Sequence, residues 1–594
     1  MEQLVVGAVE RVGVVGCGTM GSGIAEIVAS HGIPVAVVDV DAAAVERGEA
    51  RIRASVERAI DRGRLEPAEG EALLGRISLG TDWGALGACD LIVEAVPEVL
   101  ALKQAAFTRI DEVARLDAII ATNTSSLPVI DIAVHAERPN RVLGFHFFNP
   151  APVMRLIEVV RTVVTDDHVV EVARSFAERI GKTPVVVGDR RGFIANQLLF
   201  PYLNQAVWMV DSGYASKEDV DLAMRLGAGL PMGPIALTDL VGIDTFVGIM
   251  DAIHEQFDDA RFAPRPILSQ LASAGFTGRK AGRGFYRYEA PGSNRVAADA
   301  DARPPADPAL VAGWTTVGIV GTGTMATGIA EVCARAGFEV LVRARSPERG
   351  AGLLAALSAA LAEDVDRDRL DAAGAAAALG RVRLVHDDEG LAAADLVIEA
   401  VAEDAAVKAG VFARLAAVLG RDTVLATTTS SLPVIDCAMA TSRPEQVLGL
   451  HFFNPVPRMR LVEVARTVRT DPEVVERALA FVERLGHVGV VCGDRAGFIV
   501  NALLFPYLND AIRMLESFYA TAEEIDTAMR LGCGYPLGPF ELMDVVGLDV
   551  TLAIIERLRD EFRQPSYEPA PLLRHMVEAG FLGRKAGRGF HVHP

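Results

Sequence analysis

A histidine, an asparagine and a glutamate lie within thirteen residues of a mostly apolar run, at His146, Asn149 and Glu158. Two strands joined by the Pro-rich turn after Asn149 would bring Glu158 beside His146, the pairing that orients a general base and makes it more basic. A lone histidine among aromatic residues is more often a packed core residue. Here the whole pattern recurs 305 residues later, which favours a catalytic pair in each copy: His451, Asn454 and Glu463.

The N-terminal part of the chain carries the pattern of a dinucleotide site. An apolar strand over 11–15 runs into a Gly-rich turn and a helical pattern, and a second apolar strand, 35–38, ends in Asp39. Gly16 permits the tight turn, Gly18 lets the backbone approach a pyrophosphate, and Gly21 lets the helix pack near the strand. Asp39, 23 residues after Gly16, can accept hydrogen bonds from the adenosine ribose. We expect Met20, inside the turn, to line the same site.

Polar residues follow the next predicted strands at their carboxyl ends. Glu98 comes after the strand at 90–94, and Asn123 and Ser125 follow the strand at 118–122. Ligands bind at this edge of an open parallel α/β sheet. Lys103, five residues after Glu98, could reach the same cleft or lie on a helix surface. Beyond residue 187 the pattern turns helical, and Asn196 is the conspicuous polar residue of a buried helix predicted over 192–204.

Every landmark repeats at an offset of 305 residues, so the chain contains two copies of one architecture. The predicted fold class is α/β: a Rossmann-type, doubly wound dinucleotide-binding domain plus an all-α C-terminal domain, with the pair repeated twice in one chain. A Pro-, Ala-, Asp- and Arg-rich stretch between the copies predicts a linker. The expected domains are 10–187 and 188–288 in the first repeat, the linker 289–313, and 314–492 and 493–594 in the second.

Composition limits the function classes. At 594 residues, with 51% hydrophobic and 23% charged residues, the chain has the composition of a multidomain globular protein. It has no apolar run long enough for a membrane span and no signal-peptide pattern, so we expect a cytoplasmic protein. Its six cysteines form no CxxC pair, which favours reduced thiols and no metal site. A net charge of −20 argues against nucleic acid or an anionic membrane as partner.

The chain resembles the L-3-hydroxyacyl-CoA dehydrogenase family in four motifs taken together. They are the Gly-rich turn, the Asn-Thr-Ser-Ser strand end, the His-Phe-Phe-Asn-Pro run and the Gly-Arg-Lys-x-Gly-Arg-Gly-Phe segment at 278–285. The chain is similar to the short-chain, 3-hydroxybutyryl-CoA type over nearly all of both repeats, as a tandem fusion. The resemblance implies reversible NAD-dependent oxidation of a (3S)-hydroxyacyl-CoA to the 3-ketoacyl-CoA. It also implies an acyl-CoA bound between the two domains, and helical domains that supply the dimer contact.

Site roles also follow from the resemblance. His146 would take the C3 hydroxyl proton and Glu158 would hold the imidazole. Ser125 and Asn196 would hydrogen-bond the substrate oxygen and the histidine, with Asn149 supporting the site. Glu98, Lys103 and Asn123 match positions around the cofactor, and the second repeat retains the corresponding set: His451, Glu463, Ser430, Asn501, Asn454, Glu403 and Lys408.

The second cofactor pocket differs from the first. Gly321 and Gly323 keep the turn, but Gly21 becomes Ala326 and Asp39 becomes Ala344, which is flanked by arginines at 343 and 345. Loss of the acid removes repulsion toward a 2′-phosphate, and Arg345 supplies a cation for it. The second site therefore either prefers NADP(H), binds NAD(H) weakly, or is a degenerate pocket that serves as a scaffold.

Three rival functions remain open from the sequence. A 3-hydroxyadipyl-CoA dehydrogenase would need an additional cation near the acyl end. A dehydrogenase of free hydroxy acids could use the same fold without CoA. A non-catalytic dinucleotide-binding structural protein is disfavoured because both His-Glu pairs are retained. The two repeats are expected to form a pseudo-dimer within one chain, with further homo-oligomers possible.

Overall fold

The computed structural model describes residues 9–298 and 303–593. Over these residues each repeat forms an eight-stranded sheet, in the order β3-β2-β1-β4-β5-β6-β7-β8 and β11-β10-β9-β12-β13-β14-β15-β16. All neighbouring strands are parallel except β6 with β7 and β14 with β15. The first sheet consists of β1 (Val12–Val15), β2 (Val35–Val38), β3 (Ile77–Gly80), β4 (Leu91–Glu94), β5 (Ile119–Thr122), β6 (Val142–Phe147), β7 (Leu156–Arg161) and β8 (Thr183–Gly188).

The second sheet repeats the first. Its strands are β9 (Thr316–Val320), β10 (Glu339–Arg343), β11 (Val382–Val385), β12 (Leu396–Glu399), β13 (Val424–Thr427), β14 (Val447–Phe452), β15 (Leu461–Arg466) and β16 (Val488–Gly493). The central strands are apolar runs buried along their whole length, as helices on both faces of a parallel sheet require. The predicted α/β fold class, with two Rossmann-type sheets, is confirmed.

Helices cover both sheets. In the first nucleotide domain they are α1 (Thr19–Ser30), α2 (Ala42–Asp61), α3 (Pro67–Leu74), α4 (Leu100–Val113), α5 (Val129–Ala133) and α6 (Asp167–Arg179). In the second they are α12 (Thr324–Arg335), α13 (Pro347–Asp366), α14 (Ala372–Gly380), α15 (Ala405–Val418), α16 (Val434–Met439) and α17 (Pro472–Arg484). Each Gly-rich turn leads directly into the first helix of its domain, which places that helix N-terminus beside the end of the central strand.

A helical domain follows each sheet. The first contains α7 (Ala195–Asp211), α8 (Lys217–Gly227), α9 (Pro234–Val241), α10 (Ile243–Phe257) and α11 (Pro266–Ser273). The second contains α18 (Val500–Glu516), α19 (Ala522–Gly532), α20 (Pro539–Val546), α21 (Leu548–Phe562) and α22 (Pro571–Glu578). Helix α7 starts three residues later than predicted, because Gly192 and Phe193 have left-handed φ angles of +81° and +48° that cannot belong to an α-helix.

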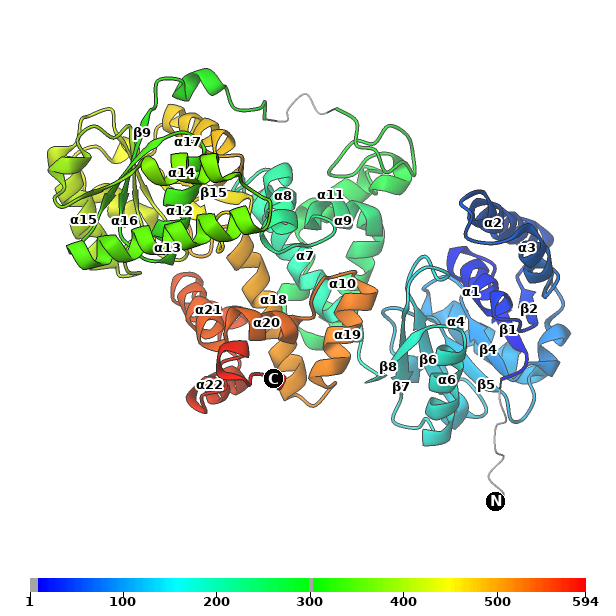
Figure 1. The fold of residues 1–594 in the computed structure, drawn as a ribbon. Coiled ribbons are helices and arrows are strands. Elements are labelled where there is room, and N and C mark those ends of the chain that lie inside the picture. The colour runs from blue at the N-terminus through cyan, green and yellow to red at the C-terminus, as the bar shows by residue number, and fades with distance from the viewer. Residues whose placement is uncertain (1–8, 299–302, 594) are drawn as a thin grey trace.

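The two helical domains pack on each other in the middle of the molecule, with the nucleotide domains on opposite sides (Figure 1). Helices α7 and α18 make the main contact. Gln205 donates to the Tyr567 hydroxyl at 3.2 Å, and Arg261 forms an ion pair with Asp510. The contacts also cross over, since α19 packs on β7 and β8 while α8 packs on β15 and β16. This is the arrangement that a pseudo-dimer within one chain requires.

The predicted linker is only partly free of the domains. Residues 299–302 lie outside the described residues, whereas Val296 forms a β-bridge with Tyr288 on one side of them. On the other side Arg303 donates to Asp219 of α8, and Val311 is buried against the second nucleotide domain. Both described ends of the linker are therefore held by neighbouring domains. In the ranges that the structure describes, no helix combines the length and apolarity needed to cross a membrane.

A buried carboxylate in the first helical domain gives a testable pH dependence. Asp221 of α8 accepts hydrogen bonds from the Ile235 and Ala236 amides and from the Tyr286 hydroxyl. Burial raises the pKa of Asp221 to about 6, although these donors oppose the shift. The folded state therefore favours the protonated acid, and the stability that this gives at low pH is lost as pH rises through about 6. We expect this loss to total about 3 kcal/mol, of which about 1–1.5 kcal/mol falls between pH 5 and pH 7.5, because the loss begins near the unfolded pKa of about 4.

Urea unfolding at pH 5 and pH 7.5 measures this effect. The Asp221→Asn variant should become more stable relative to the wild type as pH rises, because its amide does not ionise. Asp244→Asn is the control, since Asp244 pairs with Lys280 at 2.6 Å and its pKa is lowered, which places its titration below this pH window. Equal pH slopes for the wild type and Asp221→Asn would contradict the prediction.

Candidate active site

His146 and Glu158 face each other on neighbouring antiparallel strands. The register of β6 and β7 pairs the two residues directly, and His146 Nδ1 lies 2.7 Å from Glu158 Oε2. The strands are joined through the turn at Asn149 and Pro150, so the chain folds back as the spacing predicts. Because Glu158 holds Nδ1, the other ring nitrogen, Nε2, is left to face a substrate.

The second oxygen of Glu158 joins the nucleotide domain to the helical domain. Glu158 is fully buried, and its Oε1 accepts hydrogen bonds from the amides of Ile194 and Ala195, each at 3.1 Å. These amides lie at the N-terminus of α7, where the helix dipole favours a negative charge. Glu158 therefore orients the histidine and at the same time sets the position of α7, which carries Asn196.

Aromatic rings enclose the imidazole. The ring of Phe148 lies 4.6 Å from the His146 ring, centroid to centroid, and that of Phe193 lies at 5.6 Å. Only 8% of the His146 side chain is exposed. The base therefore works in an apolar setting that admits little water, where electrostatic interactions are stronger than in bulk solvent.

The predicted oxygen-binding residues lie at the ends of β5 and α7. The side-chain amide of Asn196 donates to the backbone carbonyl of Ser125 at 3.2 Å, which brings the two residues together across the domain boundary. Asn123 instead accepts a hydrogen bond from the Phe147 amide at 2.8 Å and so supports the strand that carries His146. Asn149 is exposed on the turn, and among the described residues it has no side-chain hydrogen bond. The structure thus brings Ser125 and Asn196 together but leaves Asn149 apart.

Glu98 and Lys103 belong to one charge cluster, in which Lys103 is buried and Glu98 reaches the surface. Lys103 is 1% exposed, and its ammonium lies 3.0 Å from Glu94 and 3.2 Å from Glu98. Burial alone would raise the pKa of Glu98, but Lys103, the Thr124 hydroxyl and the Ser125 amide together hold it below its usual value. Glu98 accepts from the Ser125 amide at 2.8 Å, so Lys103 acts on the strand end through Glu98.

Glu94 is the central acid of this cluster, and sequence reasoning did not assign it a role. It is fully buried and accepts hydrogen bonds from Lys103, from the Thr122 hydroxyl and from the Val96 amide. A signal was present, because a glutamate and a lysine nine residues apart recur in the second repeat as Glu399 and Lys408.

The Gly-rich turn has the shape that a dinucleotide needs. Gly16 has φ +98°, and a Cβ there would come within 2.7 Å of the Ala95 carbonyl oxygen. A Cβ on Gly21 would lie 1.8 Å from the Gly16 carbonyl oxygen, whereas one on Gly18 would meet nothing within 4 Å. Open space therefore lies over the turn at Gly18, and half-buried Met20 borders it. Asp39 closes the pocket by accepting from the Cys17 amide at 2.6 Å.

The second repeat reproduces the acid–base geometry. His451 Nδ1 lies 2.6 Å from Glu463 Oε2, and Glu463 Oε1 accepts from the amides of Ile499 and Val500 at 3.0 and 2.9 Å. Glu403 accepts from the Ser430 amide at 3.1 Å. The remaining predicted residues lie at matching positions, with Lys408 and Asn501 buried, Asn454 and Arg345 exposed, and Gly321 and Gly323 in the turn.

Each site is also supported by the other repeat. A Cβ on Gly532, at the end of α19, would lie 2.8 Å from Leu156 and 3.1 Å from the ring of Phe148, the residue that packs on His146. Gly227 of α8 approaches Leu461 and Val500 in the same way. The sequence gives no local signal for these contacts, because the partners are hundreds of residues apart.

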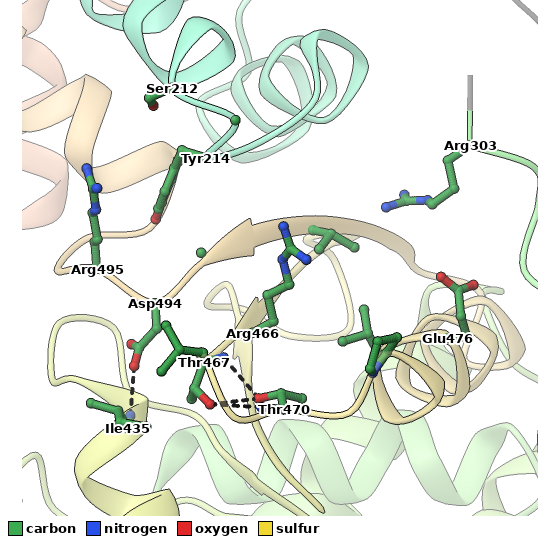
Figure 2. Close-up of a pocket in the computed structure, with 16 residues that line it drawn as sticks. Ser212, Tyr214, Arg303, Ile435, Arg466, Thr467, Thr470, Glu476, Asp494 and Arg495 are labelled. Carbon is green, nitrogen blue, oxygen red and sulfur yellow. Dashed lines mark hydrogen bonds between the residues drawn. The ribbon is translucent and has the colours of Figure 1, made fainter. Parts of the chain in front are cut away.

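A separate charged hollow of about 770 Å³ lies between the first helical domain and the second nucleotide domain. Tyr214 reaches it from the first repeat, Arg303 from the linker, and Arg466 and Arg495 from the second repeat (Figure 2). Arg466 comes directly after Ala465 of β15, which pairs with Gly449 near the start of β14. His451 lies near the other end of β14. The hollow is therefore distinct from the His451 site. Among the described residues, no three potential metal ligands gather into a group.

The first repeat has a Gly-rich turn with a terminal acid, a buried His–Glu pair and a helical domain joined to that pair, which define a two-domain, dinucleotide-dependent dehydrogenase. The second repeat keeps this architecture without the terminal acid. The family model "3-hydroxyacyl-CoA dehydrogenase, NAD binding domain" matches residues 11–190 and 316–495. The model of the C-terminal domain of the same family matches 192–288 and 497–593. The chain belongs to the 3-hydroxyacyl-CoA dehydrogenase family and is an NAD-dependent oxidoreductase acting on CH–OH groups.

Relatives match either one repeat or the whole chain. The chain is similar to 3-hydroxybutyryl-CoA dehydrogenase of Mycobacterium tuberculosis, with 45% identity over 283 residues, or 47% of this chain and 99% of that protein. It is similar to 3-hydroxyadipyl-CoA dehydrogenase of Escherichia coli K12, with 29% identity over 578 residues, or 96% and 99%. A crystal structure of 3-hydroxybutyryl-CoA dehydrogenase from Escherichia coli K12 covers 96% of this chain and 99% of its own, with a TM-score of 0.69 and 27% identity.

Proposed function

We propose that the first repeat catalyses the reversible oxidation of short-chain (3S)-3-hydroxyacyl-CoA, with 3-hydroxybutyryl-CoA as the preferred substrate. The observation that carries this proposal is the buried His146–Glu158 pair beside a Gly-rich turn that fits NAD. The 45% identity to a 3-hydroxybutyryl-CoA dehydrogenase supports the short chain length.

His146 performs the proton transfer. In the oxidation direction, His146 Nε2 takes the proton of the C3 hydroxyl while the C3–H bond breaks and the C3–O bond becomes a carbonyl. NAD, when bound, accepts the hydride from C3. Glu158 accepts the hydrogen bond from Nδ1, on the side of the ring away from the substrate, and stabilises the imidazolium that forms. In the reduction direction the same imidazolium returns its proton to the substrate oxygen.

Ser125 and Asn196 position the reacting oxygen. The Asn196 amide lies against Ser125, and Glu158 sets the start of the helix that carries Asn196. The hydroxyl of Ser125 can donate to the oxygen at C3 while His146 exchanges its proton. A donor placed where negative charge develops stabilises an alkoxide-like transition state. Domain closure around the substrate would therefore assemble base and donors together.

A dicarboxylic substrate is the second candidate. The relative that matches along the whole tandem chain is a 3-hydroxyadipyl-CoA dehydrogenase. Both candidates use the same His–Glu chemistry and differ only in the acyl end, where a second carboxylate would need a cation.

Steady-state reduction with NADH separates these possibilities. The substrates are 3-ketoacyl-CoA thioesters from C4 to C10, 3-oxoadipyl-CoA and free acetoacetate. We expect the highest kcat/KM for acetoacetyl-CoA and a value for free acetoacetate at least about 100-fold lower, since remote binding energy of CoA contributes to catalysis. Ser125→Ala should reduce kcat more than it raises KM. A higher kcat/KM for 3-oxoadipyl-CoA would support the second candidate, and equal rates with free acetoacetate would contradict acyl-CoA specificity.

We further propose that the enzyme acts in the cytoplasm as an intramolecular pseudo-dimer. The cysteines in the described ranges are all free, which suits a reducing compartment. The α7–α18 contact occupies the place of a subunit interface. A solution mass of one chain would support this proposal, whereas a mass of two or more chains would weaken it.

A further inference from the structure

The two cofactor pockets differ most at the strand end that would meet the adenosine ribose. In the first repeat Asp39 ends β2, and Asp41 caps α2 by accepting from the Ala44 amide at 2.7 Å. In the second repeat these three positions are Ala344, Ser346 and Arg349, and an exposed arginine, Arg345, replaces Val40. Two carboxylates are thus exchanged for a small apolar side chain, a hydroxyl and two guanidinium groups.

Arg343, the other arginine beside Ala344, is held away from this position. Its Nε lies 3.1 Å from Asp388, and Arg414 contacts the other oxygen of the same carboxylate at 3.0 Å. The first repeat has Val38, Trp83 and Arg109 at these positions, with the Arg109 guanidinium 4.3 Å above the Trp83 ring. Two of these three positions have changed together while the arginine at 109 and 414 is kept, and the new carboxylate of Asp388 pairs with Arg343. The cations left near the ribose position are those of Arg345 and Arg349.

The Gly-rich turn has also changed shape. Ala326 has the methyl group that would clash with the turn if it were present at Gly21. Gly321 accommodates it with φ +133°, compared with +98° for Gly16. The hydrogen bond from the Gly321 amide to the Arg343 carbonyl on β10 is 3.2 Å long, compared with 2.8 Å from Gly16 to Val38 on β2. Because Ala344 has no carboxylate, the Thr322 amide also lacks the acceptor that Asp39 gives to Cys17.

Charge decides which cofactor fits this strand end. Over 39–44 the first repeat has two acids and no base, whereas 344–349 has two arginines and one acid, Glu348. The local charge is therefore three units more positive. Ser346 reaches Glu348 and lowers its pKa, so that carboxylate is already engaged. The first repeat has a cation, Arg51, at the position of Ala356. Its guanidinium already donates a hydrogen bond to the Cys17 carbonyl oxygen. A phosphate dianion suits the second pocket and would be repelled by the first.

We propose that the second repeat binds NADP(H), with the 2′-phosphate held by Arg345 and Arg349 at the N-terminus of α13. The intact His451–Glu463 pair then makes this a second, NADP-linked active site in the same chain. The acyl-CoA chemistry of that site rests on the proposed function, whereas the cofactor preference rests on the strand end alone.

Titration of NADPH and NADH against the full chain, followed by the fluorescence of the reduced nicotinamide, tests the cofactor preference. Each wild-type chain should bind two reduced nucleotides, one at a site that prefers NADPH and one at a site that prefers NADH. In Arg345→Ala/Arg349→Ala the NADPH affinity should fall by on the order of 100-fold, because two charge-assisted contacts are lost. Arg343→Ala is the matched control and should change it little, since that guanidinium is held by Asp388. NADPH binding no tighter than NADH binding, or unchanged in the double variant, would overturn the proposal.

Turnover gives a second readout. In a His146→Gln chain, where the first site is silenced, reduction of acetoacetyl-CoA should proceed at least about tenfold faster with NADPH than with NADH. If no thioester is turned over by any variant, the proposed reaction fails while the binding titration still decides the cofactor. If NADH supports the remaining turnover better than NADPH, the second site is NAD-linked and the inference is wrong.

Discussion

The His146→Gln variant is expected to lose NADH-linked reduction of acetoacetyl-CoA by about 10²- to 10⁴-fold, the usual contribution of a positioned general acid or base. Glutamine fills a volume similar to that of the imidazole between Phe148 and Phe193 and can still bond Glu158, so packing should survive. The loss should therefore appear in kcat with little change in the NADH dissociation constant. Steady-state kinetics with a parallel NADH titration measure both quantities.

His451→Gln is the matched control, because its ring has the same contacts in the second repeat. It should leave NADH-linked turnover nearly unchanged and lower NADPH-linked turnover instead. Retention of more than about a tenth of the NADH rate in the double variant His146→Gln/His451→Gln, with normal folding, would show that His146 is not the proton-transfer group. An equal fall of the NADH rate in both variants would show that the two sites share one cofactor.

The sequence predicted most of the individual sites, because local spacing determines them. The eleven residues between His146 and Glu158 are the end of one strand, a turn and the start of the next, and the register of this hairpin places the two side chains face to face. The 305-residue offset then carried the catalytic assignments into the second repeat, whereas Gly21 and Asp39 are replaced there by Ala326 and Ala344. The Gly-rich turn and Asp39 were equally local.

Contacts that depend on how domains meet could not be predicted in this way. The bonds from Ile194 and Ala195 to Glu158 depend on where the chain enters α7, and the left-handed Phe193 that determines this has no sequence signature. The approach of Gly532 to Phe148 depends on the packing of the two repeats. The sequence places arginines on both sides of Ala344, but it does not show that Asp388, in the turn after β11, pairs with Arg343.

Lys103→Met is expected to produce the largest loss of stability, about 3–5 kcal/mol in the unfolding of the first nucleotide domain. The lysine and Glu94 are essentially unexposed, and methionine fills the space but leaves the carboxylates of Glu94 and Glu98 without their cation. Removing one partner of a buried pair costs far more than the pair contributes. Hydrogen exchange of α4 peptides, compared with urea unfolding, measures the loss in the domain concerned.

Three further variants show whether charge burial is the cause. Lys280→Met removes an exposed lysine that pairs with Asp244, so it should cost no more than about 1 kcal/mol. Lys408→Met should reproduce the large loss in the second nucleotide domain, because Glu399 and Glu403 surround it in the same way. Adding Glu94→Gln to Lys103→Met should recover part of the loss, since a neutral amide no longer needs a cation. If the double variant is less stable than Lys103→Met, lost packing rather than an unpaired buried carboxylate is responsible, and Lys103 would then serve the strand end chiefly through its aliphatic stem.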